Sequence, residues 1–238
     1  MSISIDLTAV AFDIETCPFP KGQLAAPQRE RLEKEMARHR RRGSDGLSDQ
    51  ALRRKAQGLS PFLGYICCIS AVCWQPPAPP REATSWTAAS PKEEMEMLDR
   101  FWRAVGEFPR ETTWCTFFGK GFDSPFVDAR TLRHGLQPTR QDLLDTYPYS
   151  MTPHADLSKL WTRLRYGLED LCLLLDVPSP KGGEGLSCGD GAPVVGGGSG
   201  VAAAMEAGRM DAVARYCERD ALATMRCLQS VPRSRWRR

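Results

Sequence analysis

One apolar run constrains the fold of this chain more than any other stretch. Residues 65–74, YICCISAVCW, contain a single polar residue, Ser70. The run is half as long as the ~20 apolar residues of a membrane-spanning helix, so we expect no transmembrane segment. A short apolar run of this kind predicts a strand that is buried on both faces. Such a strand needs helices above and below it, which indicates an α/β domain.

A second strand is predicted near the N-terminus. Residues 7–14 alternate, so that Val10, Phe12 and Ile14 share one face while Asp13 and Glu15 share the other. We expect this strand to end over residues 16–18, because Pro18 lacks a ladder donor. A further strand is expected over 113–118.

Helices are expected in five places. The first covers 28–42, and Gly43 closes it. The second begins at a capping box, Ser90 to Glu93, and its inward face should carry Met95, Leu98, Phe101 and Val105. The others run from Asp123 to Gly135, around 168–175 and over about 202–230. Strands interleaved with helices predict a three-layer α/β domain.

The charge of the chain is unevenly distributed. The formal net charge is +3, but residues 28–57 carry +5 and residues 233–238 carry +4, which leaves −6 on the rest. We therefore expect one domain over 1–232, with a basic helical insertion at about 27–58 and a basic tail at 233–238. Nine glycines in 182–200 predict a loop within that domain.

The cysteines argue against a zinc site and against export. Nine cysteines include no C-x-x-C pair, and only three histidines accompany them. An odd, unpatterned set is typical of a reducing cytoplasm. Asp6 and Asp13 interrupt the apolar N-terminal stretch, which lacks an early basic residue, so a signal peptide is not expected. These observations predict a cytoplasmic protein.

Two carboxylates stand together on the first strand. Asp13-Ile14-Glu15 is the only D-x-E in the chain, and this spacing puts both carboxylates on one strand face. Two like charges there repel each other unless a cation lies between them, and hard oxygen ligands suit Mg²⁺ or Mn²⁺. The alternative is a solvated strand edge.

Two further acidic positions have a structural and a functional interpretation. Tyr216 and Asp220 are one turn apart on a predicted helix, which is compatible with an ordinary exposed pair. The opposite side of that helix could pack inward through Met210, Ala214, Cys217, Ala221 and Leu228. Asp123 precedes Ser124-Pro125, so it suits a helix N-cap as well as a carboxylate that points into a cleft.

Taken in order, three segments resemble the exonuclease motifs of the DEDDy class: AFDIET (11–16), TFFGKGFDSPF (116–126) and YCERD (216–220). The chain is most similar to the predicted 3′–5′ exonucleases that resemble the proofreading domain of family-B DNA polymerases. The likeness extends to HADLSKLW (154–161) and GLEDLCLLLDVPSPK (167–181). It implies a ribonuclease-H-like fold, with a central mixed β-sheet flanked by helices.

The resemblance assigns residues to roles. It implies that Asp13, Glu15, Asp123 and Asp220 bind two Mg²⁺ ions, which Mn²⁺ can replace, and that Tyr216 completes the catalytic set. Asp156 matches a position suited to the outer shell of the metals, although an N-cap role fits it equally well. This chain has Phe118 where the family usually has asparagine.

The function implied is hydrolysis of the terminal phosphodiester at a 3′ end of single-stranded DNA, which releases nucleoside 5′-monophosphates. An exoribonuclease is the alternative within the same class, and a catalytically silent nucleic-acid-binding module or an adaptor is the alternative outside it. A protein partner remains open. Candidate nucleic-acid contacts are Phe118 and Phe122 for bases and Lys120, Arg40, Arg41 and Arg42 for phosphates.

Overall fold

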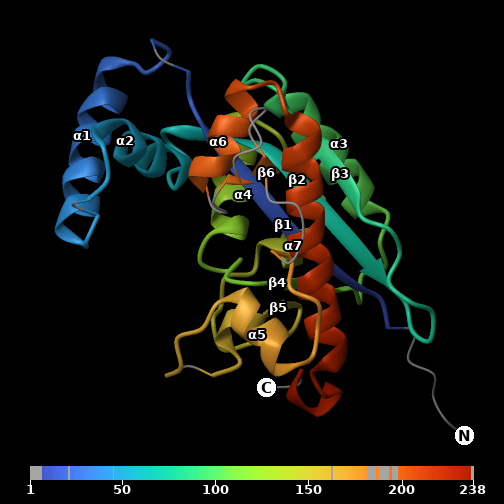
Figure 1. The fold of residues 1–238 in the computed structure, drawn as a ribbon. Coiled ribbons are helices and arrows are strands. Elements are labelled where there is room, and N and C mark those ends of the chain that lie inside the picture. Colours follow the sequence, from blue (N-terminus) through green and yellow to red (C-terminus); the bar gives the residue numbers. More distant parts are fainter. Residues whose placement is uncertain are drawn as a thin grey trace, which may run out of the picture.

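The computed structural model describes residues 7–20, 22–44, 46–161, 163–181, 186–187, 193–194 and 198–236. A five-stranded sheet runs through the molecule in the order β3-β2-β1-β4-β5 (Figure 1). Its strands are β1 (Ala9–Pro18), β2 (Gly64–Trp74), β3 (Thr84–Thr87), β4 (Thr113–Thr116) and β5 (His154–Asp156). The β1–β2 and β2–β3 pairs are antiparallel, whereas β1–β4 and β4–β5 are parallel. The sheet is therefore mixed.

Helices cover both faces of this sheet. They are α1 (Ala26–Arg41), α2 (Asp49–Gly58), α3 (Glu94–Gly106), α4 (Asp123–Arg133), α5 (Leu168–Leu174), α6 (Gly198–Glu206) and α7 (Met210–Ser230). Val10, Phe12 and Ile14 pack with α3 and α4 in one core, while Ala9 and Ala11 pack with α5 and α7 in another. The alternation predicted for β1 and the three layers are confirmed.

β1 ends where it was predicted to end, and it is irregular beside its acidic residues. It continues through residue 17 and ends at Pro18, where the missing donor is tolerated because the ladder stops there. The register shifts between Glu15 and Thr16, which leaves Cys67 of β2 as an extra residue. The Cys67 thiol donates to the backbone oxygen of Glu15. Such a bulge bends a strand and changes the direction of its side chains.

The predicted inward face of α3 was wrong at its first position. Residues 91–93 form a turn, and the helix begins only at Glu94. Ser90 and the backbone of Ala89 both donate to the Glu93 carboxylate in that turn. Met95 is consequently 50% exposed, and the buried face consists of Glu94, Met97, Leu98, Phe101, Trp102 and Val105.

The predicted last helix is two helices. Gly208 separates α6 from α7 with a φ of +71°, a left-handed conformation that glycine adopts without strain. Its N–H donates to Met205, so the end of α6 is closed by a turn. The glycine-rich stretch 182–200 lies mostly outside the described residues. Within it, β6 (Leu186–Ser187) pairs with β7 (Pro193–Val194).

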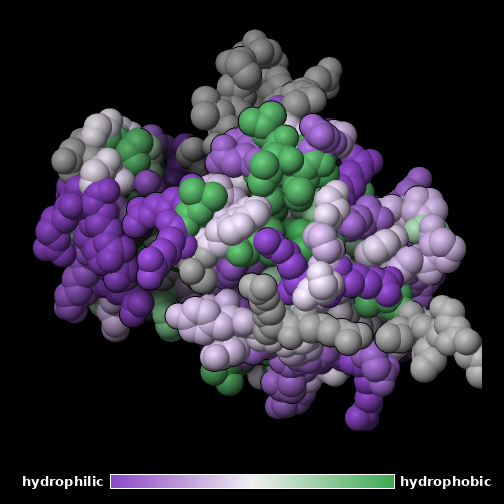
Figure 2. Space-filling model, turned by 90° about the horizontal axis from the view of Figure 1, so that it is seen from below, coloured by the Kyte–Doolittle hydropathy of each residue, from purple (hydrophilic) through white to green (hydrophobic). Residues whose placement is uncertain are grey.

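The basic insertion forms a helical pair, of which the sequence predicted only α1. Leu32 and Met36 of α1 pack against Leu52 and Ala56 of α2 and against Leu63. The pair lies beside the sheet, and its outer surface is strongly hydrophilic (Figures 1 and 2). None of the described helices combines the length and the apolar character needed to cross a membrane.

The basic tail packs onto the domain as far as residue 236. Arg233–Arg235 form a short 3₁₀ helix, η3, and the Trp236 side chain is 5% exposed within the core that contains α7. The described part of this tail is therefore not a free appendage, because its last tryptophan is anchored. Two other 3₁₀ helices are η1 (Gln141–Leu144) and η2 (Leu157–Lys159).

Candidate active site

β1 carries the first two acidic side chains toward α7. Asp13 and Glu15 have the same parity as Ala9 and Ala11, whose side chains belong to the core under α7. Cys217 of α7 donates its thiol to the backbone oxygen of Asp13 at 3.3 Å and to its carboxylate at 3.5 Å. The helix is thus held directly above the strand face predicted to be acidic.

Asp123 reaches the same place from the other side of β1. The parallel pairing of β4 with β1 stops at Ala11, and beyond it none of the described strands pairs with this edge of β1. Asp123, the first residue of α4, accepts a hydrogen bond from Ile14 N–H at 3.1 Å. The helix cap itself is Phe122, and no side chain caps it. The predicted cap role was therefore wrong, and the carboxylate of Asp123 is bound to β1 instead.

The loop between β4 and α4 has little freedom. Phe118 has a φ of +66°, in the left-handed region that asparagine enters more easily than phenylalanine. A Cβ at Gly119 would lie 2.3 Å from Thr116, and one at Gly121 would lie 3.0 Å from the Phe118 ring. The sequence TFFGKGF therefore makes one tight turn, which delivers Asp123 to β1.

Asp156 holds this turn in place. One of its oxygens accepts from the backbone of Phe118 at 2.8 Å, and the other accepts from Lys120 N–H at 3.2 Å. It also caps η2 by accepting from the backbone of Ser158. Of the two roles predicted for Asp156, the structure shows the N-cap, together with an unpredicted role as the clamp of the Asp123 loop.

α7 supplies the remaining residues of the predicted set. Tyr216 is 9% exposed and lies on the same buried stripe as Cys217 and Ala221. An exposed Tyr–Asp pair on the side opposite Cys217 was therefore a wrong prediction. Tyr216 lowers the pKa of Asp220, so its hydroxyl lies beside that carboxylate. Both side chains consequently face the carboxylates of β1.

The four carboxylates form one electrostatic unit. Ligand oxygens of Asp13, Glu15 and Asp220 lie within 4.8 Å of one another. Burial, and then the repulsion of the neighbouring carboxylates, raises the pKa values of Asp13 and Glu15 well above their usual range. Burial raises the pKa of Asp123 to about 7 and that of Asp220 to about 6. An all-oxygen donor set with raised pKa values suits a hard divalent cation.

Two contributors to the site escaped sequence reasoning. Lys181 lowers the pKa of Asp220 and forms an ion pair with Glu169 at 2.9 Å. Its only sequence signal was its place at the end of the segment 167–181. Cys217 gave no signal, because an apolar position on an amphipathic helix does not reveal a bond to a distant strand.

The candidate nucleic-acid contacts occupy different environments. Phe118 is 51% exposed, whereas Phe122 packs partly into the core beside Phe126. Lys120 is 4% exposed, and its ammonium donates to Asp145 and to the backbone oxygens of 147 and 150, which argues against a phosphate contact.

The three arginines of α1 also differ. Arg40 forms an ion pair with Asp49 at 2.5 Å, so its guanidinium already has a partner. Arg41 and Arg42 are exposed.

Comparison with known proteins gives similar solved structures and one family. The structure of the family-B DNA polymerase from the hyperthermophilic archaeon Pyrobaculum calidifontis matches 94% of this chain and 24% of its own, with a TM-score of 0.55 and 16% identity. The chain thus spans about a quarter of that polymerase. A product-bound exonuclease I matches 90% of this chain and 45% of its own at 13% identity, with a TM-score of only 0.34. No curated protein sequence matches the chain.

At this identity, the likeness to the polymerase shows the fold alone, which is ribonuclease-H-like as the sequence implied. A family profile matches residues 64–228, from the start of β2 into the last turn of α7. Asp123, Tyr216 and Asp220 lie inside that range, whereas the D-x-E of β1 precedes it. The chain belongs to the family of predicted 3′–5′ exonucleases related to the exonuclease domain of PolB.

Proposed function

We propose that this protein is a metal-dependent 3′–5′ exonuclease that hydrolyses the terminal phosphodiester of single-stranded DNA and releases nucleoside 5′-monophosphates. One observation carries the proposal. Asp13, Glu15, Asp123 and Asp220 come from three separate elements and converge where their mutual repulsion and burial oppose ionisation. A fold gains no stability from such a cluster without a cation, so a functional reason for it is favoured.

The residues present fit two divalent cations. The four carboxylates would hold Mg²⁺, with Mn²⁺ as a substitute, and when bound the ions activate water and stabilise the leaving oxygen. Tyr216 would orient the attacking water through its hydroxyl. Burial, and next Asp220, raise the pKa of Tyr216 well above 10, so the hydroxyl keeps its proton at neutral pH. Tyr216 is consequently a positioning donor and not a general base.

Two alternatives predict different outcomes. An exoribonuclease would use the same carboxylates, and a contact to the 2′-hydroxyl would distinguish it. A silent binding module would retain nucleic-acid affinity without turnover, but it would have no need for all four carboxylates. The cytoplasm is our proposal for its location, on the basis of the unpatterned cysteines alone.

The decisive experiment uses 5′-labelled single-stranded DNA and RNA of the same sequence, incubated with Mg²⁺, Mn²⁺ or EDTA. We expect a ladder that shortens from the 3′ end of DNA, that EDTA abolishes and that Asp13→Ala and Asp220→Ala lose. Asp128→Ala is the matched control, because Asp128 is an exposed carboxylate on the same helix as Asp123. Turnover that survives in Asp13→Ala would refute the proposal, and turnover of RNA alone would establish the exoribonuclease.

A further inference from the structure

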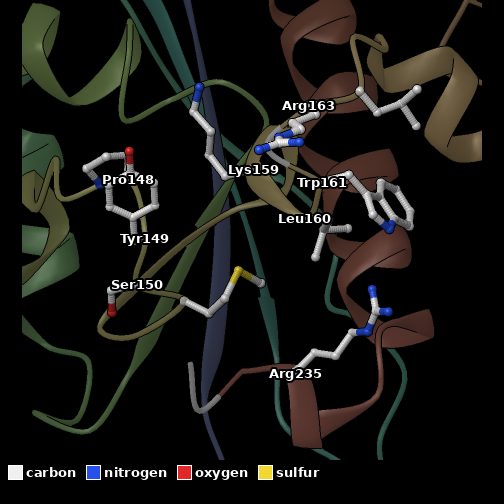
Figure 3. A pocket seen from close by; sticks show the side chains of 10 residues that line it. Pro148, Tyr149, Ser150, Lys159, Leu160, Trp161, Arg163 and Arg235 are labelled. Carbon is white, nitrogen blue, oxygen red and sulfur yellow. The ribbon is translucent and has the colours of Figure 1, made fainter.

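A cavity of about 700 Å³ lies between the segment 148–151 and the residues that follow η2 (Figure 3). Tyr149 and Trp161 provide aromatic walls on opposite sides, and Leu160 and Leu164 add apolar surface. Lys159, Arg163 and Arg235 bring three positive charges, and no carboxylate lines the cavity. Its volume lies in the range of sites that hold small organic ligands.

The cations of this cavity differ from several of those in the basic helical pair. Arg38, Arg40, Arg53 and Arg54 of the α1–α2 pair all form ion pairs with acidic side chains. Lys159 and Arg235 instead lie over aromatic rings, Lys159 at 5.3 Å from the centre of Phe118 and Arg235 at 6.0 Å from that of Trp161. Arg163 is exposed. Unpaired cations beside aromatic faces are the composition that binds single-stranded nucleic acid.

Both walls of the cavity are bonded to the loop that delivers Asp123. The ammonium of Lys120 holds one wall through the backbone oxygens of Tyr147 and Ser150. Asp156 holds the other, because it caps η2 and accepts from the backbone of Phe118. The predicted phosphate contact Lys120 is therefore a structural element of the cavity. The cavity adjoins this loop, because Lys159, which lines the cavity, lies over the Phe118 ring.

We propose that this cavity binds a nucleotide of the substrate strand upstream of its 3′ end. Trp161 and Tyr149 stack on its base, and Lys159, Arg163 and Arg235 bind the flanking phosphates. The inference rests on the proposed nuclease function for its strand polarity. It assigns a role to the C-terminal segment: the anchored Trp236 fixes the position of η3 and so holds Arg235 at the cavity. It also predicts that short substrates bind poorly.

The test measures binding without turnover. Fluorescence anisotropy with 5′-fluorescein oligo-dT of two and ten nucleotides, with Ca²⁺ in place of Mg²⁺, gives the affinity and its salt dependence. We expect the ten-nucleotide strand to bind more tightly to the wild type. Arg163→Gln combined with Arg235→Gln should lower the slope of log K against log salt by about 1.4, two phosphate contacts at ~0.7 each. Arg100→Gln, an exposed arginine on α3, is the control and should leave the slope unchanged.

A second variant tests stacking. Trp161→Ala should weaken binding of the ten-nucleotide strand about tenfold, and Trp161→Phe should restore part of the loss. Because Trp161 also packs against Tyr166, a folding defect is controlled by thermal melting, and the arginine variants stand without it. An unchanged affinity and slope in the double arginine variant would overturn the inference. Wild-type protein that binds in this way but cleaves no strand would refute the proposed function and leave the cavity assignment intact.

Discussion

Two sets of carboxylates in this molecule differ in whether the fold itself pairs their charge. Glu94, at the first turn of α3, has no exposed surface, and its charge is fully matched. The guanidinium of Arg130 donates to it from two nitrogens, His134 contacts it at 2.8 Å, and the backbone of Ile66 donates at 2.8 Å. The start of a helix adds a favourable dipole. The fold therefore completes this site by itself.

The cluster around Asp13 lacks such completion. Its neighbours are other carboxylates, and its hydrogen bonds come from a thiol and from one backbone N–H to Asp123. Lys181 and Arg219 both lower the pKa of Asp220, but none of the ion pairs among the described residues involves any of the four carboxylates. This chain pairs Glu94 closely but leaves these four carboxylates without an ion pair among the described residues, which supports the proposed metal site.

The largest expected difference between the carboxylate cluster and Glu94 is the effect of a substitution on activity. Asp220→Asn should lower single-turnover cleavage at least about 1,000-fold, because several kcal/mol of transition-state stabilisation by the cations are lost. In EDTA the same variant should be no less stable than the wild type, since one repelling charge is gone. A large loss of stability in EDTA would show that Asp220 is a structural residue like Glu94.

Glu94→Gln should show the reverse pattern. It leaves Arg130 buried without its counter-charge, so we expect the free energy of unfolding to fall by about 3–5 kcal/mol in urea titrations. Asp99→Asn on the same helix is the matched control, because its ion pair with Arg103 is exposed and worth less than about 1 kcal/mol. Equal losses of unfolding free energy in Glu94→Gln and Asp99→Asn would contradict the view that the ion pair of Glu94 stabilises the fold.

The raised pKa of Asp123 should be visible in the pH dependence of stability. A carboxyl whose folded pKa is raised to about 7 binds its proton more tightly in the folded state, so its stabilising effect is present below about pH 4 and is lost as the pH rises to 7. In EDTA, the wild type should therefore lose about 2–4 kcal/mol more than Asp123→Asn over this interval. Mg²⁺ should abolish the difference. Parallel pH curves in EDTA would show that Asp123 titrates normally.

The sequence predicted which faces meet but not which atoms bond. The spacing of Asp13 and Glu15 was sufficient to place both on one face of β1, and the i to i+4 spacing placed Tyr216 beside Asp220. These are properties of one element. The thiol of Cys217 on Asp13, the ammonium of Lys120 and the position of Lys181 depend on elements far apart in the chain, so local pattern carried no information about them.

The same limit explains the errors in the helices. Glu94 lies on the buried face of α3, where Arg130 of another helix pairs with it. A hydropathy pattern assigns a charged residue to the outer face, and that choice placed Met95 inward. The predicted helix over about 202–230 ran through Gly208, but the left-handed φ of this glycine ends α6, which contacts α2 and β1, before α7 begins.

The smallest effect concerns the loop between β4 and α4, which positions Asp123. Phe118 adopts a left-handed conformation that costs a bulky residue about 1 kcal/mol, and asparagine enters this region more easily. Phe118→Asn should gain that energy and lose about 0.5 kcal/mol of contact with Lys159. Phe118→Ala loses the same contact without relieving the backbone. In urea titrations Asn should therefore be more stable than Ala by about 1 kcal/mol, and equal stabilities would show that the turn is unstrained. Both variants remove the exposed ring, so weaker binding of single strands by both would show that this chain keeps Phe118, despite the strain, for contact with its substrate.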